Sequence, residues 1–117
     1  MEISIEGVNV EKGLSSARGR AKIFIRFLET FYKEGNEKYT DIEASFTNRD
    51  IPLYTTYVHG LKSASQIIGA EEFSKQAEML EAAGNSNDWD YISTHNATFL
   101  QALKALLENI GKALADI

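Results

Sequence analysis

The connections between the predicted helices of this chain are only a few residues long. Glycines interrupt the helical periodicity at Gly19, Gly35-Asn36, Gly69 and Gly84. Helices joined by such short turns run antiparallel to their neighbours. The chain has a single proline among 117 residues, which favours long helices over a β-sandwich. The sequence therefore predicts an all-α fold, an antiparallel up-down four-helix bundle with an additional short N-terminal helix.

Apolar residues at i, i+3 and i+4 spacing indicate where the helices lie. After a lead-in segment over residues 1–8, the helical domain spans residues 9–117, with helices expected at about 10–17, 20–33, 37–48, 53–68, 71–83 and 88–115. Residues suited to cap a helix N-terminus precede three of them: Asn9, Asp50 and either Asn87 or Asp88. Gly84 is expected to be the C-cap of the helix before it.

The composition excludes several classes of protein. A formal net charge of −5 argues against non-specific binding to nucleic acid, which depends on clustered lysines and arginines. Because the chain has no cysteine, disulfide frameworks and thiolate metal sites are excluded. No apolar run approaches the ~20 residues that span a bilayer. What remains is a single globular domain with one core.

His59 lies on the polar stripe of the 53–68 helix when that helix is drawn at ~100° per residue. The same stripe carries Thr55, Lys62, Ser63 and Gln66. Lys62 and Ser63 are three and four residues after His59, so they are its nearest neighbours up the helix. The small residues leave the imidazole uncrowded, and the lysine places a cation beside any phosphate on the ring. This pattern fits a phosphoryl acceptor, and equally an ordinary solvated histidine.

The turn at Gly69-Ala70 brings a second pair of charged residues opposite this stripe. If the flanking helices run antiparallel about position 70, residue 59 faces residue 81 and residue 62 faces residue 78. Residues 78 and 81 are both glutamates. We hypothesise that Glu81 accepts a hydrogen bond from the Nδ1–H of His59, which would leave the Nε2 lone pair outward as the nucleophile. Glu78 would hold Lys62 in the resting state. Alternatively, both glutamates are ordinary exposed helix residues.

The residues around His59 resemble the motif of the histidine-containing phosphotransfer (HPt) domain family. The matching residues are His59-Gly60-Leu61-Lys62-Ser63-Ala64-Ser65, followed by Gly69-Ala70. Similarity to the family continues in the run from Ile5 to Leu14 and in Asn48-Arg49-Asp50 before the histidine helix, so it covers nearly the whole chain. Ser63 stands where the family most often has glycine. A serine is small and can hydrogen-bond a phosphoryl oxygen.

The resemblance implies a phosphocarrier in a two-component phosphorelay. His59 would accept a phosphoryl group from the aspartyl phosphate of a receiver domain and pass it to another receiver. Lys62 would stabilise the transferring group. Glu81, which the antiparallel turn places opposite His59, is added to these two as the third expected catalytic residue. The module would hold no cofactor or metal of its own, because Mg²⁺ is expected on the receiver.

The resemblance also implies where the partner binds and where the module belongs. The side chains expected to border the docking surface are Thr55, Thr56, Ser63 and Gln66. The partners would be response-regulator receiver domains, with no nucleic acid and no direct membrane contact. We expect a monomeric, cytoplasmic module at the C-terminal end of a hybrid sensor histidine kinase, tethered to the inner membrane only through that parent.

The same residues bear on other possible functions. The chain has no GxxxxGK[ST] or GxGxxG motif, so the module is not expected to be an enzyme with its own ATP site, although its parent could be a histidine kinase. A carboxylate di-metal bundle would need Glu three residues before each histidine, where the chain has Thr56 and Ile92. His95 is interpreted as structural. Two alternatives stay open: a helical-bundle adaptor that carries no phosphate, and the phosphorylatable first domain of a chemotaxis-type kinase.

Overall fold

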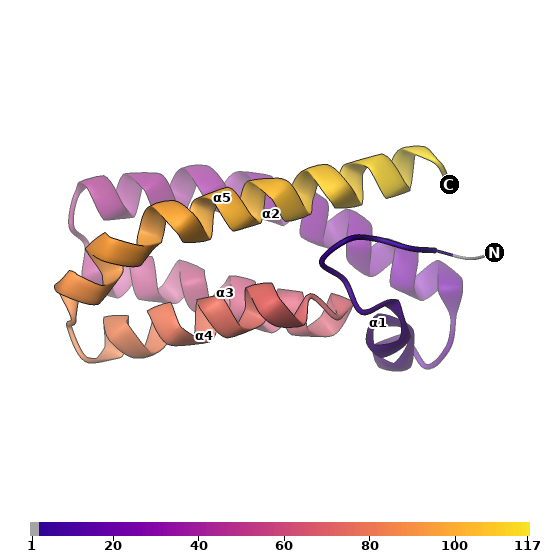
Figure 1. The fold of residues 1–117 in the computed structure, drawn as a ribbon, viewed down its shortest axis with the longest axis horizontal. Helices are drawn as coiled ribbons and strands as arrows, with labels where there is room; N and C mark the ends of the chain where they lie inside the picture. The colour runs from indigo at the N-terminus through magenta and orange to yellow at the C-terminus, as the bar shows by residue number, and fades with distance from the viewer. Residues whose placement is uncertain (1–2) are drawn as a thin grey trace.

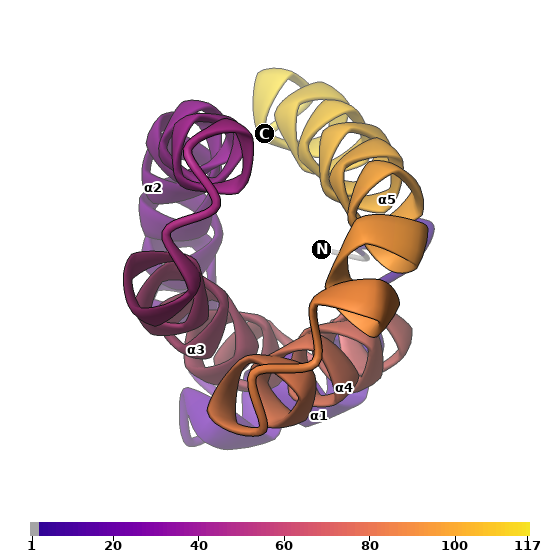
Figure 2. The same ribbon diagram turned by 90° about the vertical axis from the view of Figure 1, so that its left-hand side faces the viewer.

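The structure, a computed structural model, describes residues 3–117, and these form an all-helical bundle (Figure 1). Its helices are α1 (Val10–Ser16), α2 (Ala21–Thr47), α3 (Ile51–Ile68), α4 (Glu71–Asn85) and α5 (Trp89–Ala115). Helices α2 to α5 form a ring in which each packs against the next and α5 closes on α2 (Figure 2). The predicted up-down four-helix bundle with a short additional N-terminal helix is confirmed. Within the described part of the chain, no helix is long and apolar enough to cross a membrane.

Helix α2 is continuous over 27 residues, so the prediction of separate helices at 20–33 and 37–48 is wrong. Gly35 lies inside the helix, at a point where α5 packs closely against it. A Cβ at this position would lie 2.6 Å from Cδ2 of Leu107. The side-chain amide of Asn36 donates to the carbonyl oxygen of Tyr32 over 2.7 Å, within the same helix. The Gly-Asn pair therefore permits helix packing and does not form a turn.

The helix ends agree better with the sequence. The side chains of Asn9, Asp50 and Asp88 each accept a hydrogen bond from the backbone N–H three residues further on, as predicted. Gly69 ends α3 in the left-handed conformation, with φ of 84°. The predicted C-cap at Gly84 is wrong, because α4 continues to Asn85 and Gly84 is buried inside it.

The core lies on the axis of the bundle. The largest of its fully buried side chains are Tyr54, Phe24, Phe31, Phe99, Leu28, Ile42 and Ile68. One buried polar contact crosses this core, in which the hydroxyl of Tyr54 on α3 donates to Oδ1 of Asn96 on α5 over 2.7 Å. Burial raises the pKa of Tyr54. The contact fixes the first half of α3 against the last helix.

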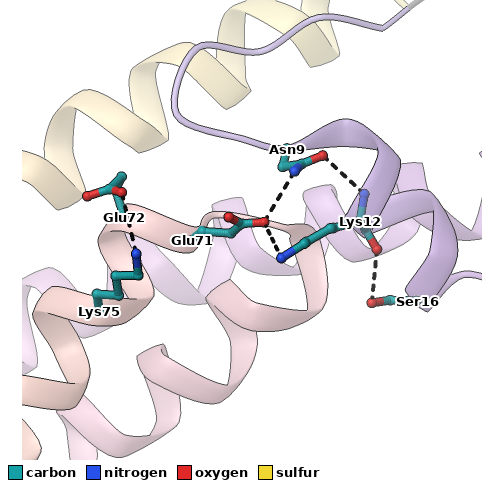
Figure 3. Close-up of polar contacts among 6 residues, drawn as sticks. All are labelled: Asn9, Lys12, Ser16, Glu71, Glu72 and Lys75. Carbon is teal, nitrogen blue, oxygen red and sulfur yellow. Dashed lines mark hydrogen bonds and ion pairs between the residues drawn. The ribbon is translucent and has the colours of Figure 1, made fainter.

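The N-terminal segment and α1 cover the end of the bundle where α3 and α4 are joined (Figure 1). The lead-in predicted over residues 1–8 is described from Ile3 onward, and residues 1–2 lie outside the described part. The backbone N–H of Asn9 donates to Gly69 O over 2.8 Å. Figure 3 shows the side chains of Asn9 and Lys12 meeting Oε1 of Glu71 at the start of α4, at 3.2 and 2.7 Å. The hydrogen bond from Lys12 holds the pKa of Glu71 below its usual value. These contacts fasten α1 to the α3–α4 turn.

Candidate functional site

His59 lies midway along α3 on its outer surface. The residues that turn inward on either side of it, Val58 and Leu61, are buried, whereas the His59 side chain is 58% exposed. The next residue, Gly60, is also exposed, and a Cβ added there would meet no atom within 4 Å. The cap at Asp50 and the left-handed Gly69 bound the helix and so fix which face each of its residues occupies. The imidazole is therefore open to a large partner.

One carboxylate joins His59 to Lys62. Nδ1 of His59 contacts Oε2 of Glu81 on α4, and Nζ of Lys62 lies 2.5 Å from Oε1 of the same residue. The side chains of Glu81 and Lys62 are 16% and 22% exposed, so the link is largely shielded from solvent. The contact expected between His59 and Glu81 is present.

The expected pair between Lys62 and Glu78 is wrong, because Lys62 binds Glu81 and Glu78 is exposed. The reason is geometric. Side chains on a helix lean toward its N-terminus, so the Lys62 side chain reaches back to the level of His59. On the antiparallel α4, Glu81 leans the opposite way, toward the level of Lys62. The Lys62 and Glu81 side chains therefore meet at a level between the backbone positions of these two residues.

The electrostatics of this cluster determine the tautomer of His59. The hydrogen bond from Lys62, and after it the one from His59, lower the pKa of Glu81 against the opposing effect of burial. An ionised carboxylate only accepts hydrogen bonds, so Nδ1 of a neutral His59 must carry the proton. Its Nε2 then holds the lone pair. Among residues 3–117, no group hydrogen-bonds to that nitrogen, and the exposed edge of the ring can act as a nucleophile.

The other predicted site residues occupy two environments. Thr56, Ser63 and Gln66 are exposed on the same helix as His59. The sequence pattern predicts Thr55 on the exposed polar stripe, but its side chain is less exposed than those of the other three residues. It is half-buried, its hydroxyl donates to Ile51 O over 2.7 Å, and its side chain lies against Gly84 of α4. Since Gly84 has no side chain, α4 comes close enough to cover Thr55.

Sequence reasoning missed an apolar residue near this surface. Ile67 is 44% exposed, so a large aliphatic side chain is open to solvent on the helix that carries His59. It lies four residues after Ser63, which places it on the same exposed face of α3. That spacing is the signal that could have identified it.

The second histidine has different surroundings. His95 is exposed on α5, and its ring packs against Tyr91 with 4.1 Å between the ring centroids. Within the described part of the chain, no lysine or carboxylate forms a hydrogen bond or ion pair with it. In residues 3–117, no three His, Asp or Glu side chains come together as a metal site. The His59–Glu81–Lys62 arrangement is thus not repeated at His95.

Comparison with known families and structures identifies the family of this chain and a solved structure with a similar fold. The model for the family described as "Hpt domain" matches residues 26–113, more than half of the chain, and this range includes His59, Lys62 and Glu81. The fold is similar to the crystal structure of the HPT domain from the Hpt Sensor Hybrid Histidine Kinase from Shewanella, with a TM-score of 0.88. The two chains are 15% identical, and the likeness covers 95% of this chain and 96% of that one. Comparison with curated proteins gives no significant match.

Proposed function

Because the chain belongs to the Hpt domain family, whose members are phosphocarriers of two-component signalling without an ATP site of their own, we propose that His59 is its phosphoacceptor. The observation that carries this proposal is the contact between Glu81 and His59 Nδ1 beneath a ring that is 58% exposed. It leaves Nε2 as the one ring nitrogen with a free lone pair. His95 lacks such a contact.

In the proposed reaction, Nε2 of His59 attacks the phosphorus of a receiver's aspartyl phosphate. The N–P bond forms while the bond from phosphorus to the aspartyl oxygen breaks, and its electron pair returns to that carboxylate. Since Nδ1 keeps its proton, the imidazole gains positive charge as the N–P bond forms. The carboxylate of Glu81 lies against Nδ1, where it stabilises this charge and holds the ring in orientation. Transfer to a second receiver reverses these steps.

Lys62 acts on the phosphoryl group in this proposal. Its ammonium group is bound to Glu81 before transfer. A phosphoryl group on His59 carries a charge of about −2 and competes with Glu81 for this cation. Lys62 is one turn from His59, so its flexible side chain reaches the phosphoryl oxygens without movement of the backbone. The receiver would supply Mg²⁺ and the acidic residues around its aspartate.

We propose that receivers dock on the exposed face of α3. The side chains that support this are the exposed polar Thr56, Ser63 and Gln66 and the exposed apolar Ile67. A small apolar contact within a polar rim is typical of transient interfaces. Thr55 would support this face indirectly, because its side chain packs on α4 and is not open to the receiver. The module would work as a monomer on the cytoplasmic side of the membrane, as part of a hybrid sensor kinase.

The proposal is tested with a receiver domain phosphorylated on its aspartate. On mixing, label should pass to the wild-type chain in an acid-labile, base-stable form. His59→Gln should take up no label, and His95→Gln should behave as the wild type. ATP alone should label none of the three. A chain that binds the phosphorylated receiver without taking up label would be an adaptor, and the proposal would be wrong.

A further inference from the structure

At Gly84, α4 packs closely against Thr55 of α3. A Cβ at this position would lie 1.9 Å from Oγ1 of Thr55 and 2.9 Å from its Cβ. The Thr55 hydroxyl is held by Ile51 O at 2.7 Å. Rotation of the Thr55 side chain would not remove the overlap, because the Thr55 Cβ itself is too close. Any side chain at position 84 must therefore push the two helices apart.

This close approach is one turn away from the phosphoacceptor on both helices. Thr55 precedes His59 by four residues, and Gly84 follows Glu81 by three. Because α3 and α4 are antiparallel, the two pairs are successive contacts along the same interface. The helix spacing at Thr55 and Gly84 consequently sets how far the Glu81 backbone lies from His59.

We propose that Gly84 is a positioning residue for the phosphoacceptor, acting through Glu81. Both oxygens of the Glu81 carboxylate are engaged, one by His59 and the other by Lys62, so the group has a single position that satisfies both. Carbon atoms in contact are about 3.5–4.0 Å apart, so an alanine at position 84 moves α4 outward by at least about half an ångström. Such a displacement loosens one or both contacts. The inference rests on the proposed role of His59.

Gly35 provides a control for adding a methyl group at a helix interface elsewhere in the bundle. It is also a buried glycine inside a helix, and a Cβ there would lie 2.6 Å from Leu107 Cδ2 at the α2–α5 interface. Leu107 Cδ2 is the end of a flexible side chain that can rotate away, so Gly35→Ala adds a methyl group to a helix–helix contact that includes none of His59, Lys62 or Glu81. Gly84→Ala strains the α3–α4 contact, which includes all three of these residues.

The experiment compares Gly84→Ala, Gly35→Ala, Thr55→Gly and the double variant Thr55→Gly/Gly84→Ala. Thermal unfolding establishes that each is folded. Two site readouts follow: the ¹⁵N resonances of the His59 ring, which report whether Nδ1 carries a hydrogen-bonded proton, and the rate of labelling by phosphoramidate. This small donor needs no docking surface, so the result does not depend on a receiver.

Gly84→Ala should lower the labelling rate by about tenfold to a hundredfold, as expected for a misplacement of up to 1 Å, and should alter the His59 ring resonances. Gly35→Ala should leave the rate and the resonances as in the wild type. The double variant, which removes the Thr55 side chain, should recover both readouts relative to Gly84→Ala.

A Gly84→Ala domain with wild-type rate and resonances would overturn the inference, and so would equal losses in Gly35→Ala. If Gly84→Ala does not fold, the double variant decides: recovery to the level of Thr55→Gly supports the inference, and a lower rate overturns it. Failure of the proposed function looks different, since the wild type would then take up no label on His59. The ring resonances would still show whether Gly84 positions Glu81.

Discussion

Nζ of Lys62 lies 2.5 Å from Oε1 of Glu81, so the cation nearest to the phosphoacceptor is bound by a carboxylate before any phosphate arrives. The same carboxylate accepts a hydrogen bond from His59 Nδ1. Glu81 therefore has two tasks in the resting state: it fixes the orientation of the ring and it keeps the ammonium group within one turn of it. Phosphorylation would change the partner of Lys62 without changing that of Nδ1.

Removal of the ammonium group should slow transfer and leave the fold intact. We expect Lys62→Met to lower the rate of labelling from a phosphorylated receiver by about tenfold to a hundredfold, because the charge of the transferring group loses its cation. Lys62→Arg keeps the charge and should retain a larger part of the rate. Rapid-quench kinetics measure both variants. Equal rates for Lys62→Met and the wild type would show that Lys62 has no part in transfer.

Glu81→Gln tests the orientation of the ring. The amide keeps the size of the side chain but loses the charge that stabilises the imidazole during attack. We expect a loss of about tenfold or more in the labelling rate, the range typical of groups that orient a functional histidine. Glu78→Gln is the matched control, because it removes an exposed carboxylate one turn away on the same helix. If both variants lose rate equally, the effect is one of surface charge and not of orientation.

The lowered pKa of Glu81 makes a prediction about acid. The folded-state pKa lies below the unfolded value of 4.5, so ionised Glu81 stabilises the fold fully above that value, and the contribution is lost as pH falls through the folded-state pKa. Glu81→Gln weakens two hydrogen bonds to a charged group, so it should lower the free energy of unfolding by about 1–3 kcal/mol at pH 7. Urea unfolding of both proteins from pH 7 to pH 3 should show this difference shrinking toward acid. A constant difference would contradict the assigned ionisation.

Tyr54→Phe should destabilise the bundle without affecting the chemistry. The change leaves Oδ1 of Asn96 buried without its 2.7 Å donor, which costs about 1–3 kcal/mol. Tyr57→Phe is the control on the same helix, since the Tyr57 ring is only half-buried and Lys38 lies over its face, a contact that phenylalanine preserves. Urea unfolding compares the two variants with the wild type. Labelling by phosphoramidate, measured alongside, should be equal in all three.

Much of the site follows from local sequence rules. The cap at Asp50 and the turn at Gly69 fix the ends of α3, and an antiparallel return about that turn places residue 81 opposite residue 59. The pairing of Lys62 does not follow from this counting. It depends on the direction in which helical side chains lean, which shifts its partner by one turn.

The sequence-based prediction of helix ends is least successful at glycines. The sequence pattern places Gly35 and Gly84 at helix ends, yet both lie inside helices where a neighbouring helix approaches. Glycine serves helix ends because it tolerates positive φ, and helix interfaces because it lacks a side chain. The one-dimensional pattern is the same in both cases. Only the partner across the interface, Leu107 or Thr55, distinguishes them.

The central claim is that phosphate is carried on Nε2 of His59 while Nδ1 stays bonded to Glu81. The most direct measurement is ¹⁵N and ³¹P NMR of the phosphorylated domain, which identifies the nitrogen that is coupled to phosphorus. We expect one phosphorylated histidine, His59, with coupling at Nε2 and a proton retained on Nδ1. Phosphorus on Nδ1 of His59, or on either nitrogen of His95, would contradict the account.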